Sequence, residues 1–362
     1  MALSVHIKKK LKDFELAVDF DMEEGIVGFL GSSGCGKSMT LKCIAGIETP
    51  DEGSIVLDGE VLFDKKAGID LSPQKRKVGY LFQNYALFPH MTVRQNIEAG
   101  LEASGKSKQE KKDIVERLLE QFHIKELENS YPVRISGGQQ QRAALARMMA
   151  AEPKFLLLDE PFSALDTYLK EKLMQEMMTY LSQFKKGVIM VSHSRDEVYQ
   201  MCTDTAIMHQ GILETVGKTK EIFDNPGTVN AARLTGCKNI SKADKLSESE
   251  IYASEWDIKL TFPEYIKIPS NLTHVGIRAH EIRPVKFSDI DNNTSIKLNV
   301  VDCQLKRISE APFEMYLILQ NKSGKNTSPL WWKVTKKEWK EIGETVPETV
   351  ELPVEKVILL QH

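Results

Sequence analysis

The chain has 362 residues, which favours two domains rather than one core. Its 41% hydrophobic and 27% charged residues are ordinary for a globular protein, and a net charge of −3 lacks the basic excess of nucleic-acid-binding domains. No apolar run reaches the roughly 18 residues of a membrane span, and the N-terminus lacks the apolar core of a secretory signal. The five cysteines are scattered without CxxC pairs, which argues against a zinc site or a disulfide framework.

In the first ~230 residues, short β-branched runs alternate with helical patterns, which is typical of an α/β layered domain. The segments "GIVGFLG", "KFLLLDE" and "GVIMVSH" are almost continuously apolar, as strands buried on both faces are. The segments 108–122 and 168–184 carry apolar residues at helical spacing. We expect an α/β domain over 1–232, with a helical subdomain at about 88–150.

The first glycine loop follows the apolar run that ends at Leu30. It reads "GSSGCGKS", the Gly-x-x-x-x-Gly-Lys-Ser pattern of a P-loop, and a helical segment follows it as far as Gly46. Glycines let the backbone wrap around phosphates, and N–H groups at a helix start hold negative charge. The residues expected to bind ATP here are Gly31, Ser32, Ser33, Gly34, Cys35, Gly36, Lys37, Ser38 and Met39. Lys37 would reach the β- and γ-phosphates, and the Ser38 hydroxyl would ligate Mg²⁺.

Two acids end the later apolar run "FLLLDEP". After a P-loop, such a pair predicts a magnesium acid, Asp159, followed by a carboxylate, Glu160, that can polarise an attacking water.

A second glycine loop, "ISGGQQQRAALARMMA", begins at Ile135 and also precedes a long helical run. One nucleotide site has no evident need for two such anion-binding loops. The residues alone leave the purpose of the second loop open.

The chain changes character after about Thr235. Alternating patterns in "SIKLNVVDCQLKRI" and "FEMYLILQ" predict strands, "QNKSGKNTS" predicts a turn, and all four tryptophans lie in this part. We expect a small, mostly β domain over 236–362.

Taken in order, "GSSGCGKS", "LFQNYALFPHMTV", "ISGGQQQRAALARMMA", "FLLLDEP", "SALD" and "VSH" resemble the nucleotide-binding subunits of ATP-binding cassette (ABC) transporters. The resemblance covers roughly the first 230 residues and is greatest to importer ATPases of the molybdate, sulfate and sugar group. It implies an α/β P-loop ABC ATPase domain that acts as a head-to-tail homodimer. Each ATP lies between the P-loop of one subunit and the SGGQ loop of the other, so the second glycine loop completes the partner's site.

The resemblance also assigns roles to single residues. Glu160, His193 and Gln83 would be catalytic, and Gln83 would join Ser38 and Asp159 around Mg²⁺. The contacts made across the interface would come from Ser136, Gly137, Gly138 and Gln139, and Asp166 of "SALD" would lie at the dimer seam. Phe14 is the candidate for stacking on adenine; the alternative is a core position.

Two positions depart from the family pattern. Ile135 replaces the usual leucine before SGGQ, a change that should preserve packing. Ser194 follows the switch histidine where relatives commonly have aspartate, which puts a seam contact in doubt.

Partners follow from the same resemblance: integral-membrane permease subunits and, indirectly, an extracytoplasmic solute-binding protein. The segment "NYALFPHMTVRQNI" would receive a short permease helix, and its aromatic residues suit a docking groove. The chain would sit peripherally on the cytoplasmic face of the membrane.

"LTGCKNI" and "VGIRAHEIRP" resemble the OB-like accessory domain that follows many importer ATPases. We expect an oxyanion cargo (molybdate, tungstate or sulfate), with sugar, polyamine or ferric iron as alternatives. Lys238, Arg278, Arg283 and Lys306 are suitable anion-binding types, but such side chains are usually a solvated face. The domain is either a ligand sensor or a dimer-stabilising spacer.

Other classes fit less well. Soluble cassette ATPases that act on nucleic acid or ribosomes usually carry two cassettes or long basic insertions, and neither is present. A regulatory protein with a degenerate site would not need both Glu160 and His193.

Overall fold

The structure is a computed structural model that describes residues 3–163, 165, 167–184, 186–285, 299–324 and 327–361. The chain divides into two compact units, Met1–Lys220 and Glu221–His362. This division lies before the 232–236 boundary expected from the sequence. Within the described ranges, no helix combines the length and the apolar composition that crossing a bilayer requires.

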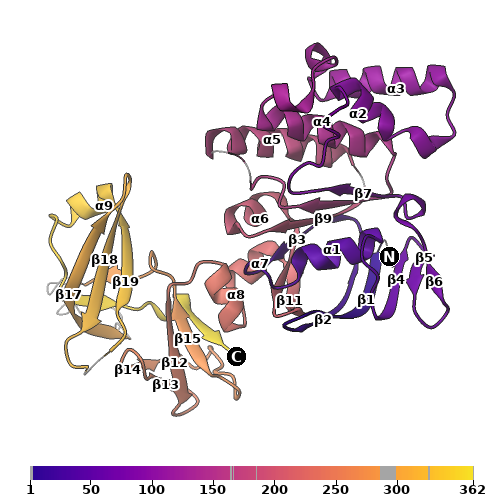
Figure 1. Ribbon diagram of the computed structural model, residues 1–362. Coiled ribbons are helices and arrows are strands. Elements are labelled where there is room, and N and C mark those ends of the chain that lie inside the picture. Colours follow the sequence, from indigo (N-terminus) through magenta and orange to yellow (C-terminus); the bar gives the residue numbers. More distant parts are fainter. Residues whose placement is uncertain are drawn as a thin grey trace. The chain divides into compact units, whose positions relative to one another are not determined.

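The first unit is built on an 11-stranded sheet (Figure 1). In spatial order its strands are β6 (Ile69–Asp70), β5 (Glu60–Asp64), β4 (Glu52–Leu57), β1 (Leu3–Lys10), β2 (Glu15–Met22), β11 (Ile212–Lys218), β10 (Asp204–His209), β3 (Gly25–Leu30), β9 (Gly187–Ser192), β8 (Phe155–Asp159) and β7 (Val78–Leu81). The run from β10 to β7 is parallel, whereas β1, β2, β4 and β5 pair antiparallel.

Strands β8 and β9 are buried along their entire length, as their unbroken apolar sequences predict. The helices of the first unit are α1 (Lys37–Ala45), α2 (Val93–Ala99), α3 (Lys108–Gln121), α4 (Gly137–Ala150), α5 (Thr167–Gln183) and α6 (Arg195–Met201); α7 (Thr219–Asp224) crosses the division between the units. Short 3₁₀ turns lie at Pro73–Lys75, Glu102–Ser104, Lys125–Leu127 and Pro132–Arg134.

Helices α2, α3 and α4 pack on one another and form a helical layer, whereas α1 packs against β7, β8 and β9 (Figure 1). Each of α2, α3 and α4 begins with a capping box, from Thr92, Ser107 and Ser136. In this motif a hydroxyl accepts from the backbone N–H three residues on, and that residue's side chain accepts from the cap. The local sequence therefore starts each helix independently of its packing.

The second unit begins with α8 (Val229–Leu234) and contains two five-stranded sheets, in agreement with the OB-like domain expected there. One sheet runs β14 (Ile258–Thr261), β13 (Glu250–Ala253), β12 (Asn239–Lys245), β15 (His274–Ile277) and β21 (Val357–Leu360). The other runs β16 (Arg283–Pro284), β20 (Thr349–Glu351), β17 (Val300–Glu310), β18 (Glu314–Asn321) and β19 (Leu330–Thr335). A helix, α9 (Lys336–Glu341), follows β19, and a 3₁₀ turn, Val354–Lys356, precedes β21.

The core of the second unit contains three of the four tryptophans, with Trp256 and Trp332 each 1% exposed and Trp339 buried. Large aromatic side chains supply much of the apolar area that a small β domain can bury. The cysteines are all free and buried, so the framework contains no disulfide.

Candidate functional site

The motif residues meet because of strand order. Strands β3, β9, β8 and β7 are parallel neighbours, so their carboxyl ends lie along one edge of the sheet. The segments that leave those ends are the first glycine loop, His193, the acids at 159–160 and Gln83. Ligands of open α/β sheets bind at this edge.

Backbone space explains the glycines of the first loop. A Cβ on Gly31 would lie 2.4 Å from the carbonyl oxygen of Met208, and Gly36 has a φ of +112°. The loop wraps around the Lys37 ammonium, which is buried and donates to the carbonyls of Gly31 (2.7 Å) and Ser32 (2.8 Å). Ser32, Ser33 and Gly34 are exposed, and Met39 is half-buried in the first turn of α1. The arrangement is a loop around a cation at a helix start, which is suited to phosphate.

Hard oxygen ligands lie next to this loop. The Ser38 hydroxyl donates to Asp159 Oδ1 at 2.7 Å, and Asp159 is 6% exposed. No group of three or more His, Cys, Asp or Glu side chains in the described chain could hold a metal by itself. One hydroxyl and one carboxylate beside a phosphate loop still fit Mg²⁺, which takes few protein ligands and completes its shell with phosphates and water.

Glu160, Gln83 and His193 are brought together by the structure. Glu160 Oε2 accepts from Gln83 Nε2 at 3.2 Å and lies 3.4 Å from His193 Nδ1. The Glu160 backbone has a φ of +46°, and its N–H donates to the Val191 carbonyl of β9 at 3.0 Å. This carboxylate can therefore accept a proton from a water that an amide and an imidazole help to orient.

The residues on either side of His193 hold its backbone. Ser192 Oγ donates to the buried Glu197 Oε2 at 2.5 Å, and the N–H of Ser194 donates to Ser192 Oγ at 2.9 Å. Ser194 is also the N-cap of α6. The serine found where relatives commonly have aspartate therefore retains a structural role, because both residue types cap helices.

The second glycine loop does not join this cluster within the chain. Ser136 and Gln139 bond to each other as the capping box of α4, and α4 lies in the helical layer, apart from α1 (Figure 1). Gly137 is exposed, whereas a Cβ on Gly138 would lie 3.0 Å from Leu173 of α5. The capping box thus occupies the N–H groups of Ser136 and Gln139, and Gly137 is the exposed glycine at this helix start. The first glycine loop of the same chain lies elsewhere, at the carboxyl edge of the sheet. Asp166 lies outside the described residues.

Phe14 lies just before β2 and is half-buried. Its ring is next to Gly211, where a Cβ would come within 2.7 Å of Phe14 Cδ2, and the Gly211 N–H donates to the Cys35 carbonyl of the first loop. The ring is thus near the phosphate loop, as stacking on a base would require, although stacking itself stays a prediction.

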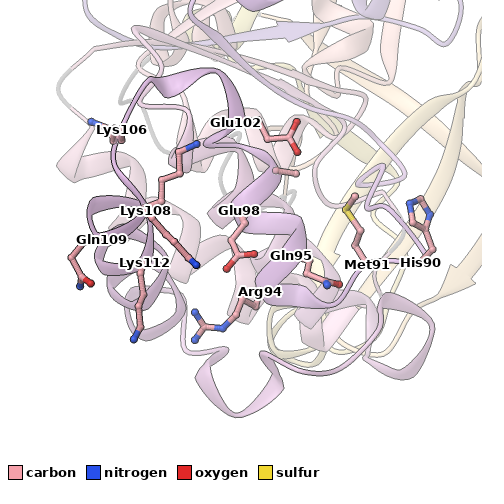
Figure 2. Close-up of a pocket in the computed structure, with 12 residues that line it drawn as sticks. His90, Met91, Arg94, Gln95, Glu98, Glu102, Lys106, Lys108, Gln109 and Lys112 are labelled. Atoms are coloured by element: carbon pink, nitrogen blue, oxygen red, sulfur yellow. The ribbon is translucent and has the colours of Figure 1, made fainter.

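Two hollows lie on the helical side of the unit, and neither is lined by the residues expected to bind ATP. The larger, about 1250 Å³, lies between α2 and α3, with Lys108 and Lys112 on one wall and Glu98 on the other (Figure 2). The smaller, about 420 Å³, is a groove that includes Tyr80, Phe82 and Phe88. Both are lined partly by the segment "NYALFPHMTVRQNI".

Tyr80 and Arg147 are residues of this region that the sequence did not single out. The Tyr80 hydroxyl donates to Asp159 Oδ2 at 2.8 Å, and burial, followed by the nearby Asp159 charge, raises the Tyr80 pKa. Arg147 donates to the carbonyls of Tyr85 (3.1 Å) and Ala86 (2.8 Å), and its guanidinium lies over the Phe88 ring. The sequence gives no signal for the bond from Tyr80 to Asp159, because that bond depends on β7 lying beside β8.

The four cations suggested in the second unit lie in different surroundings. Arg278 donates to the carbonyls of Thr235 and Phe223, and Arg283 lies 3.5 Å from Glu355. Lys238 lies over the Tyr316 and Trp331 rings, and Lys306 is exposed on β17.

Comparison with known proteins agrees with this geometry. The family model described as ABC transporter matches residues 16–163. The chain is 36% identical over 296 residues to the sulfate/thiosulfate import ATP-binding protein CysA of Mesostigma viride, which is 81% of each chain. It is 39% identical over 224 residues to the spermidine/putrescine import ATP-binding protein PotA of Oleidesulfovibrio alaskensis, 62% of this chain and 58% of that protein. It is 36% identical over 225 residues to the molybdenum import ATP-binding protein ModC of Paramagnetospirillum magneticum, 62% of this chain and 61% of that protein.

Among solved structures, a dimeric post-hydrolysis state of the ATP-binding cassette MJ0796 bound to ADP and phosphate matches with a TM-score of 0.51 and 26% identity. The match covers 60% of this chain and 99% of that one. The matched part of this chain is about as long as the first unit.

Proposed function

We propose a function from one premise: this chain belongs to the ABC transporter family, as an ATP-binding subunit of the import type. Such a subunit is an ATPase whose turnover is coupled to transport, and it acts as a dimer with membrane permease subunits. Three matters are proposed for this chain: the work of each residue in the ATP site, the docking surface and the cargo.

The proposed site divides its work among the residues at the carboxyl edge of the sheet. The N–H groups of 32–38 and Lys37 would bind the phosphates, and Ser38 with Asp159 would hold Mg²⁺, which would supply positive charge beside the phosphates. Glu160 accepts the proton of the attacking water, and Gln83 and His193 orient that water. One observation carries this proposal. Gln83, Glu160 and His193 follow three separate strands, and Glu160 Oε2 lies 3.2 Å from Gln83 Nε2 and 3.4 Å from His193 Nδ1.

A second copy supplies the missing side of each site. Ser136, Gly137, Gly138 and Gln139 would reach the γ-phosphate of the partner's ATP from the start of α4, where the helix dipole favours negative charge. ATP then binds the closed dimer more tightly than the open one, and that difference drives the conformational change in the permease.

The docking surface we propose is the segment "NYALFPHMTVRQNI" with the two hollows it lines. Phe88 is 42% exposed at the groove, and Arg147 holds the loop behind it through the Tyr85 and Ala86 carbonyls. A short permease helix with an apolar face suits this groove. The chain would then lie on the cytoplasmic face of the membrane.

For the cargo we propose an oxyanion, with sulfate or thiosulfate first and molybdate next. The match to the sulfate/thiosulfate protein spans 296 residues, which exceeds the 220 residues of the first unit and so continues into the second. The match to the polyamine relative spans 224 residues, which is about the length of the first unit alone. A polyamine is the alternative to an oxyanion, because the relative named for polyamine import is 39% identical to this chain over those residues.

The cargo is tested by uptake in the source cells. Deletion of the gene should abolish uptake of labelled sulfate or molybdate while spermidine uptake continues, and a Glu160→Gln copy should fail to restore the uptake that the parent gene restores. If deletion abolished spermidine uptake and left sulfate and molybdate uptake intact, the cargo would be a polyamine and not an oxyanion.

Cargo sensing by the second unit is tested by tryptophan fluorescence. All the tryptophans lie in this unit, and Trp331 is half-buried beneath the Lys238 ammonium. A saturable change with sulfate or molybdate would support a sensor, and a flat titration would support a spacer.

A further inference from the structure

Both carboxylate oxygens of Asp159 are held by hydroxyl groups. Ser38 donates to Oδ1 at 2.7 Å from the phosphate loop, and Tyr80 donates to Oδ2 at 2.8 Å from the neighbouring strand β7. Because Asp159 is 6% exposed, water has little access to replace either donor. The two bonds together fix the rotation of the carboxylate plane.

The other side of Tyr80 lies against the groove. Tyr80 and Phe82 both line it, and their ring centroids are 4.4 Å apart. Phe82 directly precedes Gln83, whose amide reaches Glu160. One side chain thus extends from the proposed docking groove to the acid expected to hold the metal.

We propose that Tyr80 is a positioning residue, which orients Asp159 toward Mg²⁺ and transmits packing changes in the groove to that carboxylate. The part of this inference that concerns the groove's occupant rests on the proposed function. The hydrogen bond from Tyr80 to Asp159 is independent of it. Groups that hold a metal ligand from behind typically change metal affinity or activity about 10- to 100-fold when removed.

The substitution Tyr80→Phe keeps the ring and removes only the hydroxyl. We expect the Mg²⁺ concentration at half-maximal ATP hydrolysis to rise about 10-fold, with a smaller loss of kcat at saturating Mg²⁺. In the non-hydrolysing Glu160→Gln background, Mn²⁺ binding in the presence of ATP, followed by electron paramagnetic resonance, should weaken by a similar factor. This second readout does not depend on turnover.

The matched control is Tyr265→Phe, which removes a hydroxyl from a residue that is 78% exposed in the second unit. Its Mg²⁺ midpoint and Mn²⁺ affinity should equal those of the parent. A Tyr80→Phe protein with parental metal midpoints would overturn the inference, as would a lower kcat with an unchanged midpoint, because a merely structural role predicts that pattern.

The link to the groove is tested by Phe82→Leu, which removes the ring packed against Tyr80 and leaves the hydroxyl in place. We expect the Mg²⁺ midpoint to shift in the same direction as in Tyr80→Phe, by a smaller factor. An unchanged midpoint would overturn the link. If the parent chain hydrolysed no ATP with Mg²⁺, the proposed function would fail instead, so the two failures are distinguishable.

Discussion

Glu160 adopts a backbone conformation that its residue type disfavours. Its φ of +46° lies in the left-handed region, which costs a non-glycine residue about 1 kcal/mol or more. The 3.0 Å hydrogen bond from its N–H to the Val191 carbonyl holds this conformation, which turns the carboxylate toward Gln83 and His193. The strain therefore accompanies the arrangement that a general base at this position needs.

We predict that Glu160→Gln lowers kcat for ATP hydrolysis about 10²- to 10⁴-fold, because an amide cannot accept the proton of the attacking water. ATP-dependent dimerisation should persist, since the amide keeps the shape and hydrogen-bonding capacity of the side chain. Phosphate release and size-exclusion chromatography with ATP measure the two effects.

Glu152→Gln is the matched control for this change. Glu152 also has a left-handed backbone, with a φ of +49°, but its side chain is 57% exposed and pairs with Lys106. Its hydrolysis rate should equal that of the parent. Parental hydrolysis by Glu160→Gln would show that another group accepts the proton.

The sequence predicted residues whose type and spacing carry the chemistry, such as Lys37, Ser38 and Glu160. It could not predict Tyr80, because its role depends on β7 lying beside β8, a pairing between segments about 80 residues apart in sequence. Arg147 could not be predicted either. Its partners are backbone carbonyl oxygens, and because every residue has such an oxygen, the sequence does not indicate which ones it binds.

At the scale of elements, α5 and α6 are connected through a buried carboxylate. Lys170 of α5 lies 2.5 Å from Glu197 Oε1 of α6, while Ser192 donates to the other oxygen, Oε2. The Glu197 side chain is 5% exposed and that of Lys170 is 28% exposed. This contact fixes the helix that follows His193 relative to the helix that follows the "SALD" segment.

We predict that Lys170→Met lowers the free energy of unfolding by about 1–3 kcal/mol, because it leaves a buried carboxylate with only one strong partner. Denaturant unfolding of the full chain measures this loss. Lys172→Met is the control on the same helix, since Lys172 is exposed and should change stability by less than about 0.5 kcal/mol. Equal stability of the two variants would contradict a structural role for the pair.

Most long elements of the first unit could be predicted from periodicity and caps. The P-loop helix ends at Ala45 with Gly46 as a left-handed C-cap, next to the end expected at Gly46. The apolar spacing over 108–122 predicted a helix there, and α3 covers Lys108–Gln121 with Val115, Leu118 and Leu119 buried. Short elements such as α6, with seven residues, carry too little periodicity to be predicted.

At the scale of the whole molecule, the fold keeps the chain's two glycine loops apart, so the composite site proposed above needs a second copy. The first loop lies at the carboxyl edge of the sheet, and the second begins α4 in the helical layer. Both loops lie at a helix start, a position that favours anions. A second copy in the proposed head-to-tail orientation would bring unlike loops together twice, as two-fold symmetry requires.

This arrangement is tested by mixing two defective chains. A Lys37→Ala chain lacks a phosphate-binding side chain in its first loop, and a Ser136→Arg chain blocks its second loop. In a heterodimer, one site combines both defects and the other combines two intact loops. An equal mixture gives about half heterodimers by chance pairing, so independent sites would restore roughly a quarter of parental hydrolysis.

Hydrolysis in the mixture would also be lost if the two sites had to hydrolyse ATP together. The mixture is therefore repeated with Glu160→Gln in both chains, and dimerisation is measured in place of hydrolysis. ATP-dependent dimers should then form in the mixture and not in either chain alone, because only the heterodimer keeps one complete pocket to hold ATP across the interface. Dimers formed equally well by the Ser136→Arg chain alone would show that the second loop takes no part in binding ATP. Absence of dimers from the mixture, when the Glu160→Gln chain by itself dimerises, would show that one complete pocket is insufficient for closure. Since one ATP held across two chains stabilises the dimer in proportion to its occupancy, the dimer fraction in the mixture should rise with ATP concentration and saturate.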